Sequence, residues 1–340
     1  MKTKVLLDAI NSVFPGTTKK GLLPGSNMII ISNGEFSTFN DRISVSAYVD
    51  DPGLNIVCAV DAHNLKDVVK GIKEEEIDLS IGDHILSIVS ENTEAELNVT
   101  SDIETILSML DKLGINDLKF TDLPKDFNTG IALTKFNISD DYSCRNNLFC
   151  LQIKDGIIYT ADNNRCSRYK MAGGTGHTVL IPKNSIDDLV SFNPTGMATT
   201  PGWAHFINDD DLIFSCNTVV GEYPVTENLF LVPESTVVHL PEELKEILED
   251  ITSLYDESLA SHKGIKIEIK EGFMYCEIEK EKIWVKKKIK MPEDNPPEVS
   301  FHLSSIFLLE ILDHTKEILV SDTKAVFQTD VYTHVLLLQI

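Results

Sequence analysis

An internal threefold repeat limits the folds open to this chain of 340 residues. A glycine followed by a long stretch of alternating apolar and polar residues occurs three times, about 120 residues apart. The three stretches begin after Gly34, Gly156 and Gly272. Because the spacing is nearly constant, we interpret each copy as one structural unit.

A second landmark recurs in the same order along the chain. It consists of a strand end, a cap-like polar residue or proline, and then apolar residues at helical spacing. The three copies begin at Val60, Ile181 and Phe301. A helix that opens with proline follows Leu123 and Leu240, and an amphipathic N-terminal helix takes that place in the first copy.

The repeat predicts both the domain boundaries and the fold class. Each unit contains a helix, several strands, a helix and several strands over roughly 115 residues, which is an ordinary domain size. Parallel βαβ units would need a helix after nearly every strand, and residues 27–60 and 74–100 contain no helical pattern. We therefore predict an α+β fold in which each domain packs two helices on antiparallel sheets. The predicted domains are residues 1–121, 122–234 and 235–340.

The charge of the chain restricts its partners. The formal net charge at pH 7 is −23, and such a surface repels nucleic acid at long range. Any contact with DNA must therefore come from local basic clusters. No apolar run reaches the ~18 residues of a membrane span, and the six cysteines are scattered without a CxxC pair. We expect a cytoplasmic protein with reduced thiols, without a membrane segment, a disulfide framework or a metal site.

Recognisable catalytic signatures are missing from the sequence. It contains neither a GxSxG nucleophile motif nor an HExxH zinc motif. The acidic run 209–211 could bind a metal, but it lies between two strand-like stretches, which favours a solvated hairpin turn. We therefore predict a protein that is not an enzyme and has no cofactor. A metal-dependent hydrolase using these carboxylates is the remaining enzymatic alternative.

Several strings lie in an order and spacing known from one protein family. The family has a strand ending in Thr-Asp-Gly-His-Arg-Leu where this chain has YTADNNRCSRYKM (159–171). It has Val-Pro-Arg-Lys followed by a helix where this chain has IPKNSIDDLVSF (181–192). VVGEYPVTENLFLVP (219–233) is similar to its Gly-[Arg/Glu]-[Phe/Tyr]-Pro crossing, CRNNLFCLQI (144–153) to its Arg-x-x-Leu-x-Gly strand, and the chain ends on a strand, THVLLLQI. In these strings, in length and in three-domain order, the chain resembles the bacterial-type DNA sliding clamp, the beta subunit of DNA polymerase III. A divergent member, such as a phage-encoded clamp, would have this pattern.

The resemblance implies a function without catalysis. Two chains of three domains would close into a homodimeric, six-domain ring around duplex DNA, with contacts to phosphate that do not depend on sequence. The ring would act as a processivity factor in DNA replication. Its further partners would be a DNA polymerase and a clamp loader, bound through short apolar peptide motifs. The alternative is a clamp-fold, acidic, protein-binding scaffold that does not encircle DNA.

The basic residues that the resemblance places toward DNA lie in the first two domains. Two lysines follow the first helix, and a helix predicted over 62–73 carries three more at i, i+4 and i+7, which form one stripe. An ordinary solvated helix face is equally compatible with that stripe, and the acidic helix 241–250 departs from a surface that should face DNA. The candidate DNA-binding residues are Lys19, Lys20, Lys66, Lys70, Lys73, Arg145 and Lys183.

The resemblance also implies a groove for partner peptides between the second and third domains. The family's Gly-His is replaced by Asn163-Asn164 and its leucine by Cys166, so we expect an altered peptide preference. The C-terminal apolar run could instead be an ordinary core strand. The residues carried over to the groove are Leu148, Ala161, Asp162, Asn163, Arg165, Cys166, Pro233, Val335, Leu336, Leu337 and Leu338.

Head-to-tail closure of the ring would join the first domain of one chain to the third domain of the other. The candidate contact residues are Leu97, Val99, Leu254 and Tyr255. A lysine run at 286–288 lies outside the predicted helices, and protection of an edge strand is its preferred role.

Overall fold

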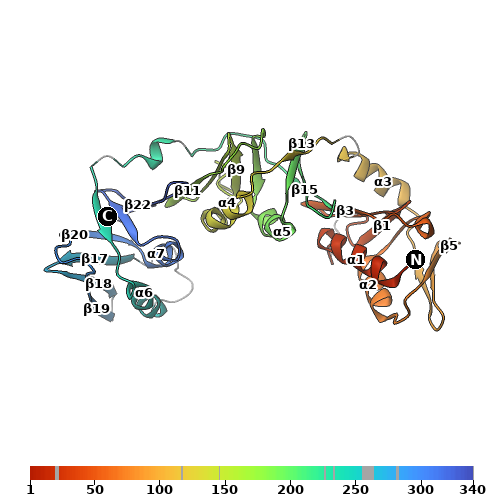
Figure 1. The fold of residues 1–340 in the computed structure, drawn as a ribbon, viewed down its shortest axis with the longest axis horizontal. Helices are drawn as coiled ribbons and strands as arrows, with labels where there is room; N and C mark the ends of the chain where they lie inside the picture. The colour runs from red at the N-terminus through yellow and green to blue at the C-terminus, as the bar shows by residue number, and fades with distance from the viewer. Residues whose placement is uncertain are drawn as a thin grey trace. The chain divides into compact units, whose positions relative to one another are not determined.

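The chain folds into an α+β protein with antiparallel sheets, which confirms the fold class that the repeat predicts (Figure 1). The computed structural model describes residues 1–19, 23–115, 118–144, 146–225, 227–232, 234–254, 264–280 and 283–339. Contacts divide the chain into two compact units. The first unit comprises Met1–Ile131, Ile153–Gly156 and Ala172–Gly221, and the second comprises Ala132–Gln152, Ile157–Met171 and Glu222–Ile340.

The helices form where the landmarks predict them, and one further helix is present. In α1, Leu6, Ile10 and Val13 are completely buried, so this helix packs through one apolar face. The α-helices are α1 (Thr3–Val13), α2 (Ala62–Gly71), α3 (Ile103–Asp111), α4 (Phe127–Thr134), α5 (Ile186–Phe192), α6 (Leu244–Ser253) and α7 (Ser305–Leu312). The short 3-10 helices are η1 (Phe14–Gly16), η2 (Pro52–Leu54), η4 (Lys135–Asn137), η5 (Lys183–Ser185) and η6 (Glu227–Phe230). Among the helices that the structure describes, none has the length and apolar character needed to cross a membrane.

The strands follow the same threefold order. Those of the first repeat are β1 (Met28–Ser32), β2 (Glu35–Phe39), β3 (Ile43–Tyr48), β4 (Val57–Asp61), β5 (Asp78–Gly82), β6 (Ile85–Val89) and β7 (Glu94–Asn98). Those of the second are β8 (Thr121–Asp122), β9 (Cys150–Lys154), β10 (Ile157–Ala161), β11 (Arg165–Lys170), β12 (Val179–Pro182), β13 (Gly196–Thr200), β14 (Trp203–Ile207) and β15 (Ile213–Asn217). Those of the third are β16 (Thr236–His239), β17 (Gly264–Lys270), β18 (Phe273–Lys280), β19 (Ile283–Lys290), β20 (Val299–Ser304), β21 (Glu317–Val320), β22 (Lys324–Gln328) and β23 (Tyr332–Leu337).

The repeated glycines are turn residues in all three copies. Each has a positive φ, 89° at Gly34, 78° at Gly156 and 78° at Gly272, and the residue before each one also has a positive φ. Two successive residues with positive φ are typical of the tight turn that starts a twisted hairpin. The glycine landmark in the sequence therefore reports a real and repeated backbone conformation.

Each long alternating stretch after these glycines reads as one continuous strand in the sequence, but in the structure it is a hairpin of two strands. Ala161 at the end of β10 pairs with Cys166 in β11, and the polar residues between them form the turn. The carboxylate of Asp162 accepts backbone hydrogen bonds from Asn164 at 2.8 Å and from Arg165 at 3.0 Å. Asx side chains stabilise turns in this way, so the polar cluster in the sequence is a chain reversal.

One long antiparallel sheet organises the first unit. Its strand order is β4-β1-β2-β3-β15-β14-β13-β8, and a smaller sheet has the order β5-β6-β7. Apolar residues of β1 and β2 are buried on both faces: Ile29, Ile31 and Phe36 on one face are 0% exposed, and Ile30 on the other is 1% exposed. α3, which the sequence did not predict, packs its buried Ile106 against Ile30 of this sheet.

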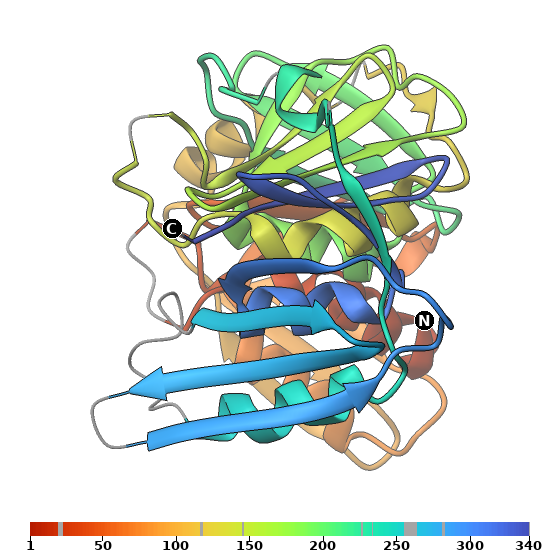
Figure 2. The same ribbon diagram turned by 90° about the vertical axis from the view of Figure 1, so that its left-hand side faces the viewer.

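The second unit contains the strands β10-β11-β23-β22-β21-β16 in that order and a four-stranded sheet with the order β19-β18-β17-β20. In the four-stranded sheet, Ile265, Ile267 and Ile269 alternate with polar residues along β17 and are buried. Figure 2 shows α6 and α7 behind this sheet, and both helices contact its outer strands. Helices on one face of an antiparallel sheet are the layer arrangement that the repeat predicts.

The predicted domain boundaries stay a prediction. The compact units follow the hydrogen-bonded ladders, because a ladder joins strands from two successive repeats. In the first unit Ser44 of β3 lies opposite Ser215 of β15. In the second unit Cys166 of β11 lies opposite Val335 of β23. Strand pairing across a repeat boundary produces many contacts there, so contact density alone does not separate the repeats.

Two buried serine–histidine pairs stabilise the sheets. Ser215 Oγ lies 2.8 Å from His205 Nδ1, and Ser167 Oγ lies 2.7 Å from His334 Nδ1. All four residues are 0% exposed. Burial lowers the pKa of His205 to about 4 and that of His334 to about 3, because the charged imidazolium is disfavoured away from water. Both rings are therefore neutral core groups at pH 7.

The free energy of unfolding is expected to fall as the pH drops below about 6.5, the ordinary histidine pKa. Unfolding exposes both rings, so the unfolded state binds protons that the folded state excludes. Each histidine then contributes a loss of up to about 1.4 kcal/mol per pH unit between its unfolded and folded pKa values. Urea denaturation at about pH 7 and pH 5 measures the slope. An equally steep slope in a His205→Gln variant would contradict the assignment for that ring.

Candidate functional site

A groove with a volume of about 460 Å³ lies in the second unit beside the β10–β11 turn. We call it the hairpin groove. It is formed by the end of that hairpin, the segment after Gly221, and the adjoining ends of β22 and β23. Its lining residues are Asn146, Leu148, Ala161, Asp162, Asn163, Arg165, Cys166, Pro224, Val225, Asn228, Leu229, Thr323, Lys324, Val335 and Leu337.

The structure brings most of the sequence-predicted groove residues together around this cavity. The predicted residues that line it are Leu148, Ala161, Asp162, Asn163, Arg165, Cys166, Val335 and Leu337. Leu336 is only 1% exposed and points into the core instead. Leu338 lines a different cavity, and Pro233 lies outside the described residues. Successive side chains of a strand point to opposite faces, so a run of four consecutive residues could not all face one groove.

The segment after Gly221 supplies groove residues that sequence reasoning missed. Tyr223 and Phe230 are buried and anchor this segment at both ends, with Phe230 packed against the ring of Tyr159. Leu229 remains 44% exposed at the groove, and its carbonyl accepts a 2.9 Å hydrogen bond from Lys324 Nζ. The string GEYP (221–224) marked this segment in the sequence by its similarity to the family. The string did not indicate which residues of the segment face the cavity.

Arg165 stabilises the groove wall and is fully engaged within the protein. Its Nε donates to Asp162 Oδ2 at 2.8 Å, its Nη2 donates to the carbonyl of Phe136 at 2.9 Å, and its Nη1 forms an ion pair with Glu310. The guanidinium also lies 3.8 Å from the ring centroid of Phe307. A guanidinium held in this way is a structural support, so the groove does not offer it to an anionic ligand.

The floor of the hairpin groove is apolar and closely packed. Ala161, Cys166 and Val335 are 4%, 6% and 2% exposed. Burial raises the pKa of the Cys166 thiol to about 12, and a protonated thiol is a weak nucleophile. Leu229 and Leu337 stand at the rim and are 44% and 50% exposed. An apolar floor with exposed leucines at its rim suits apolar side chains of a ligand.

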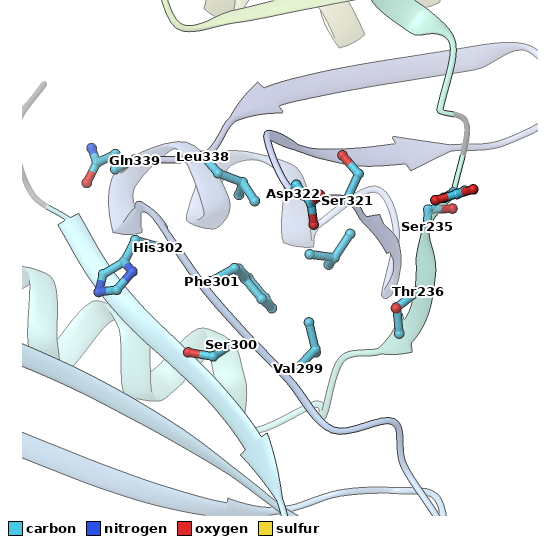
Figure 3. A pocket seen from close by; sticks show the side chains of 12 residues that line it. Ser235, Thr236, Val299, Ser300, Phe301, His302, Ser321, Asp322, Leu338 and Gln339 are labelled. Carbon is cyan, nitrogen blue, oxygen red and sulfur yellow. The ribbon is translucent and has the colours of Figure 1, made fainter.

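A second cavity of about 520 Å³ lies on the third repeat, and Figure 3 shows its lining side chains. They come from β16, β20, the turn between β21 and β22, and the segment after β23. Ser235, Ser300, Asp322 and Gln339 give this cavity a largely polar wall, and they are exposed. The smaller hairpin groove has the more apolar wall of the two, which makes it the stronger candidate for recognising an apolar peptide.

The basic candidates that the structure describes all belong to the first unit. Lys66 and Lys70 lie on α2, where Lys66 Nζ is 3.9 Å from the ring centroid of Phe14. Lys73 was predicted on this helix, but α2 ends at Gly71 and Ile72 is extended, so the lysine stripe has two members. Lys19 and Lys73 are exposed, and Lys183 is half-buried in η5. Lys20 and Arg145 lie outside the described residues.

The tentative dimer residues occupy different environments. Leu97 lies on β7, the last strand of its sheet, and is half-buried. Val99 forms a bridge to Val60 within the first repeat. Leu254 caps α6 at its C-terminal end and is 41% exposed. Tyr255 lies outside the described residues.

The acidic run 209–211 lies in the turn between β14 and β15, which confirms the preferred interpretation. The side-chain oxygen of Asn208 accepts backbone hydrogen bonds from Asp210 and Leu212, both at 3.1 Å. In the described part of the chain, no group of three histidine, cysteine, aspartate or glutamate side chains is arranged to hold a metal ion.

Comparison with solved structures identifies the fold. A sliding clamp from Bacillus subtilis matches with a TM-score of 0.78 at 17% identity, over 100% of this chain and 98% of that one. The beta clamp of H. pylori matches with a TM-score of 0.82 at 14% identity, over 100% and 98%. A sliding clamp from Pseudomonas aeruginosa matches with a TM-score of 0.79 at 16% identity, over the same shares.

Sequence comparison adds no closer relative. No protein-family model matches the chain, and none of the curated proteins matches it significantly. The likeness therefore lies in the three-dimensional structure and extends from end to end. Over its full length, the chain has the fold of the bacterial DNA polymerase III beta sliding clamps, as a divergent form at low sequence identity.

Proposed function

We propose that the protein is a DNA sliding clamp that closes as a homodimer around duplex DNA and tethers a replicative polymerase. The full-length structural match to bacterial clamps carries this proposal, because it includes every repeat and almost the whole of each clamp chain. A protein in this role needs no catalytic group and works in the cytoplasm, where bacterial or phage DNA is copied. Three repeats per chain give six domains in the ring.

The electrostatics define how such a ring would hold DNA. Lys66 and Lys70 on α2 are basic groups of the first unit, and exposed Lys19 adds a third after η1. The net charge of −23 and the acidic residues of α6 oppose DNA elsewhere. Retention by phosphate contacts alone would be weak and sensitive to salt. Encirclement would hold the protein on DNA without strong contacts.

The hairpin groove is the proposed docking site for partner peptides. Its apolar floor and exposed rim leucines fit one or two apolar side chains of a short motif from a polymerase or a clamp loader. The H. pylori clamp was solved in complex with diflunisal, and a P. aeruginosa clamp was solved bound to griselimycin. Proteins of this fold therefore accept small ligands.

A topological experiment tests the proposal. The protein is loaded onto nicked circular DNA by a clamp loader with ATP, and the complex is isolated and divided. One half is cut once with a restriction enzyme, and both halves are washed in high salt, which removes contacts that rely on charge. We expect the protein to remain on the circles and to leave the linear DNA.

Equal loss from circular and linear DNA would contradict encirclement. The net charge of −23 would then favour the second candidate, an acidic clamp-fold scaffold that binds proteins without enclosing DNA. Such a scaffold should still bind apolar peptides in the hairpin groove. Because both functions require peptide binding, the DNA-retention result separates them, and a peptide-binding measurement on the same preparation shows that the protein is folded and active.

A further inference from the structure

The third residue after each repeated glycine marks one face of the sheet in every copy. In the first copy this residue is Ser37, which lines a cavity together with Leu107 and Leu110 of α3. In the second copy it is Tyr159, whose ring centroid lies 6.3 Å from that of Phe230 in η6. α3 and η6 each come directly after the strands of their own repeat. In the first two copies, this face is therefore covered by the segment that follows the repeat.

In the second copy, a tyrosine and a cation hold the covering segment. Arg168 lies directly across the hairpin from Tyr159, and its guanidinium is 4.8 Å from the ring centroid of Phe230. Arg168 also forms an ion pair with Glu227, and the hydroxyl of Tyr159 donates a 2.5 Å hydrogen bond to the same carboxylate. Glu227 and Phe230 are three residues apart in η6. The pair therefore binds one carboxylate and one aromatic ring from a single short turn.

The third copy repeats this pair on a face that is open to solvent. Tyr275 is the third residue after Gly272, and Lys288 lies directly across the hairpin from it. Figure 2 shows this face of the sheet toward the viewer, with α6 and α7 behind the strands. Trp284 on the same face is 61% exposed, and the side chain of Lys270 is 43% exposed.

The open face is rich in lysine and aromatic side chains. Alternation along β17, β18 and β19 turns them outward, since the intervening Ile267, Met274 and Ile289 are buried. Among the described residues of these strands, the outward charged and aromatic side chains are Lys266, Lys270, Lys286, Lys288, Lys290, Phe273, Tyr275, Trp284, Glu268, Glu277 and Glu279. Lysines outnumber glutamates here, although the net charge of the chain is −23. This face therefore attracts an anionic group that most of the protein surface repels.

Lys288 holds the place of Arg168 but contacts aromatic rings instead of a carboxylate. Its Nζ is 3.5 Å from the ring centroid of Phe273 and 5.6 Å from that of Tyr275, and these are its contacts within the described chain. An ammonium group in this position can still donate charge-assisted hydrogen bonds to an incoming carboxylate. Lys288 is therefore placed to receive such a group, as Arg168 receives Glu227.

We propose that this face docks a segment of a partner protein in which a carboxylate precedes an aromatic residue by three positions. The spacing is that of Glu227 and Phe230 in η6. The carboxylate meets Lys288 and the hydroxyl of Tyr275, and the aromatic ring lies against the same two side chains. None of the residues of this face lines the hairpin groove. The inference therefore holds whether or not the protein encircles DNA.

Single-stranded nucleic acid also combines negative charge with flat rings, but two observations favour a peptide. The covering segment of the second copy is itself a peptide with the required spacing. The open face also keeps glutamates between its lysines: Glu268 lies 3.0 Å from Lys270, and Glu277 lies 3.1 Å from Lys286. These carboxylates would repel the successive phosphates of a nucleic-acid strand, whereas a peptide brings one carboxylate to Lys288.

Fluorescence anisotropy of the full-length protein with a labelled peptide tests the docking. The peptide is TENAFS, the sequence of η6 with its leucine replaced by alanine to remove the side chain that suits the hairpin groove. We expect Tyr275→Ala with Lys288→Ala to weaken binding at least tenfold, and Lys288→Glu alone, which alters an exposed side chain, to do the same. Lys288→Arg keeps the cation and should bind within about twofold of wild type. Absence of binding to wild type would overturn the proposal.

The matched control is Tyr48→Ala with Lys4→Ala, because both residues are exposed in the first unit. This control should bind the peptide as wild type does. Leu229→Asp with Leu337→Asp, which alters the hairpin groove, should also leave this binding unchanged. Loss of binding in the groove variant would instead assign the peptide to the groove and overturn the proposal. Retention on circular DNA is unaffected by either outcome, so the proposed function is judged separately.

A competing ligand and a cross-link complete the test. A short oligothymidylate should bind more weakly than the peptide. Tighter binding of the oligothymidylate, lost in Tyr275→Ala with Lys288→Ala, would assign the face to single-stranded nucleic acid and overturn the peptide proposal. A peptide with benzoylphenylalanine in place of its phenylalanine should label β18 or β19 under ultraviolet light, as located by mass spectrometry. Labelling confined to other strands would contradict the docking site.

Discussion

Replacing Leu229 and Leu337 together by aspartate is expected to weaken peptide binding by at least 100-fold. Both leucines line the hairpin groove and are 44% and 50% exposed, so neither supports the core. Each substitution removes apolar contact area and places a charge where an apolar ligand would desolvate it. Two losses of about 1.4 kcal/mol each already amount to a factor of about 100.

The measurement uses fluorescence anisotropy with the tightest member of a library of labelled hexapeptides that carry two apolar side chains. Val237→Asp is the matched control, because Val237 is 46% exposed on β16 and lies outside the groove. The control should bind as wild type does. Undiminished binding to the double variant would exclude the hairpin groove as the peptide site. Leu336 is unsuitable for this test, because it is 1% exposed and its substitution would perturb folding.

Replacing Arg165 by methionine is expected to lower the free energy of unfolding by about 3 kcal/mol. The substitution leaves Asp162 and Glu310 without their cation and removes a donor from the carbonyl of Phe136. The side chain of Arg165 is 8% exposed and that of Asp162 is 17% exposed, so water compensates little at this end. The side chain of Glu310 is 35% exposed, so water can solvate its carboxylate in the variant. The expected loss of stability is therefore at the lower end of the range for buried ion pairs.

Arg168→Met is the matched control for this prediction. Arg168 lies on the same strand and pairs with Glu227, but the two side chains are 32% and 58% exposed. An exposed pair of this kind contributes less than about 1 kcal/mol. Both substitutions remove the same formal charge. A difference between their free energies of unfolding, measured by urea denaturation, therefore reports the difference between the buried and the exposed ion pair. Equal, small losses in the two variants would show that Arg165 does not stabilise the groove wall.

The hairpin groove shows which features of the candidate site could be predicted from the sequence. The polar cluster 162–166 was placed at the groove by resemblance, and the structure puts Asp162, Arg165 and Cys166 in its lining. Their physical roles were not predictable from the pattern. Arg165 is saturated by partners from η4 and α7, and such partners become neighbours only when distant segments pack together.

The largest errors of the sequence-based prediction concern the directions of side chains on β23 and the length of helix α2. Four consecutive apolar residues at the C-terminus were assigned to one groove, although strand alternation sends Leu337 to the groove and Leu336 to the core. The helix predicted to reach Lys73 ends at Gly71, because Ile72 adopts an extended backbone. Apolar periodicity alone did not locate that end. α3 was not predicted, because it is not among the landmarks that recur in all three copies.

The sequence by itself determined the threefold repeat, the turn glycines, the α+β class and the positions of the paired helices. These features depend on local conformational preference and on the period of apolar residues, which a pattern records directly. Only the tertiary structure decided which strand edges are joined and which remain open, and which leucines line a groove. Those properties arise from pairing between residues more than a hundred positions apart, such as Cys166 and Val335, and no local pattern encodes such a pairing.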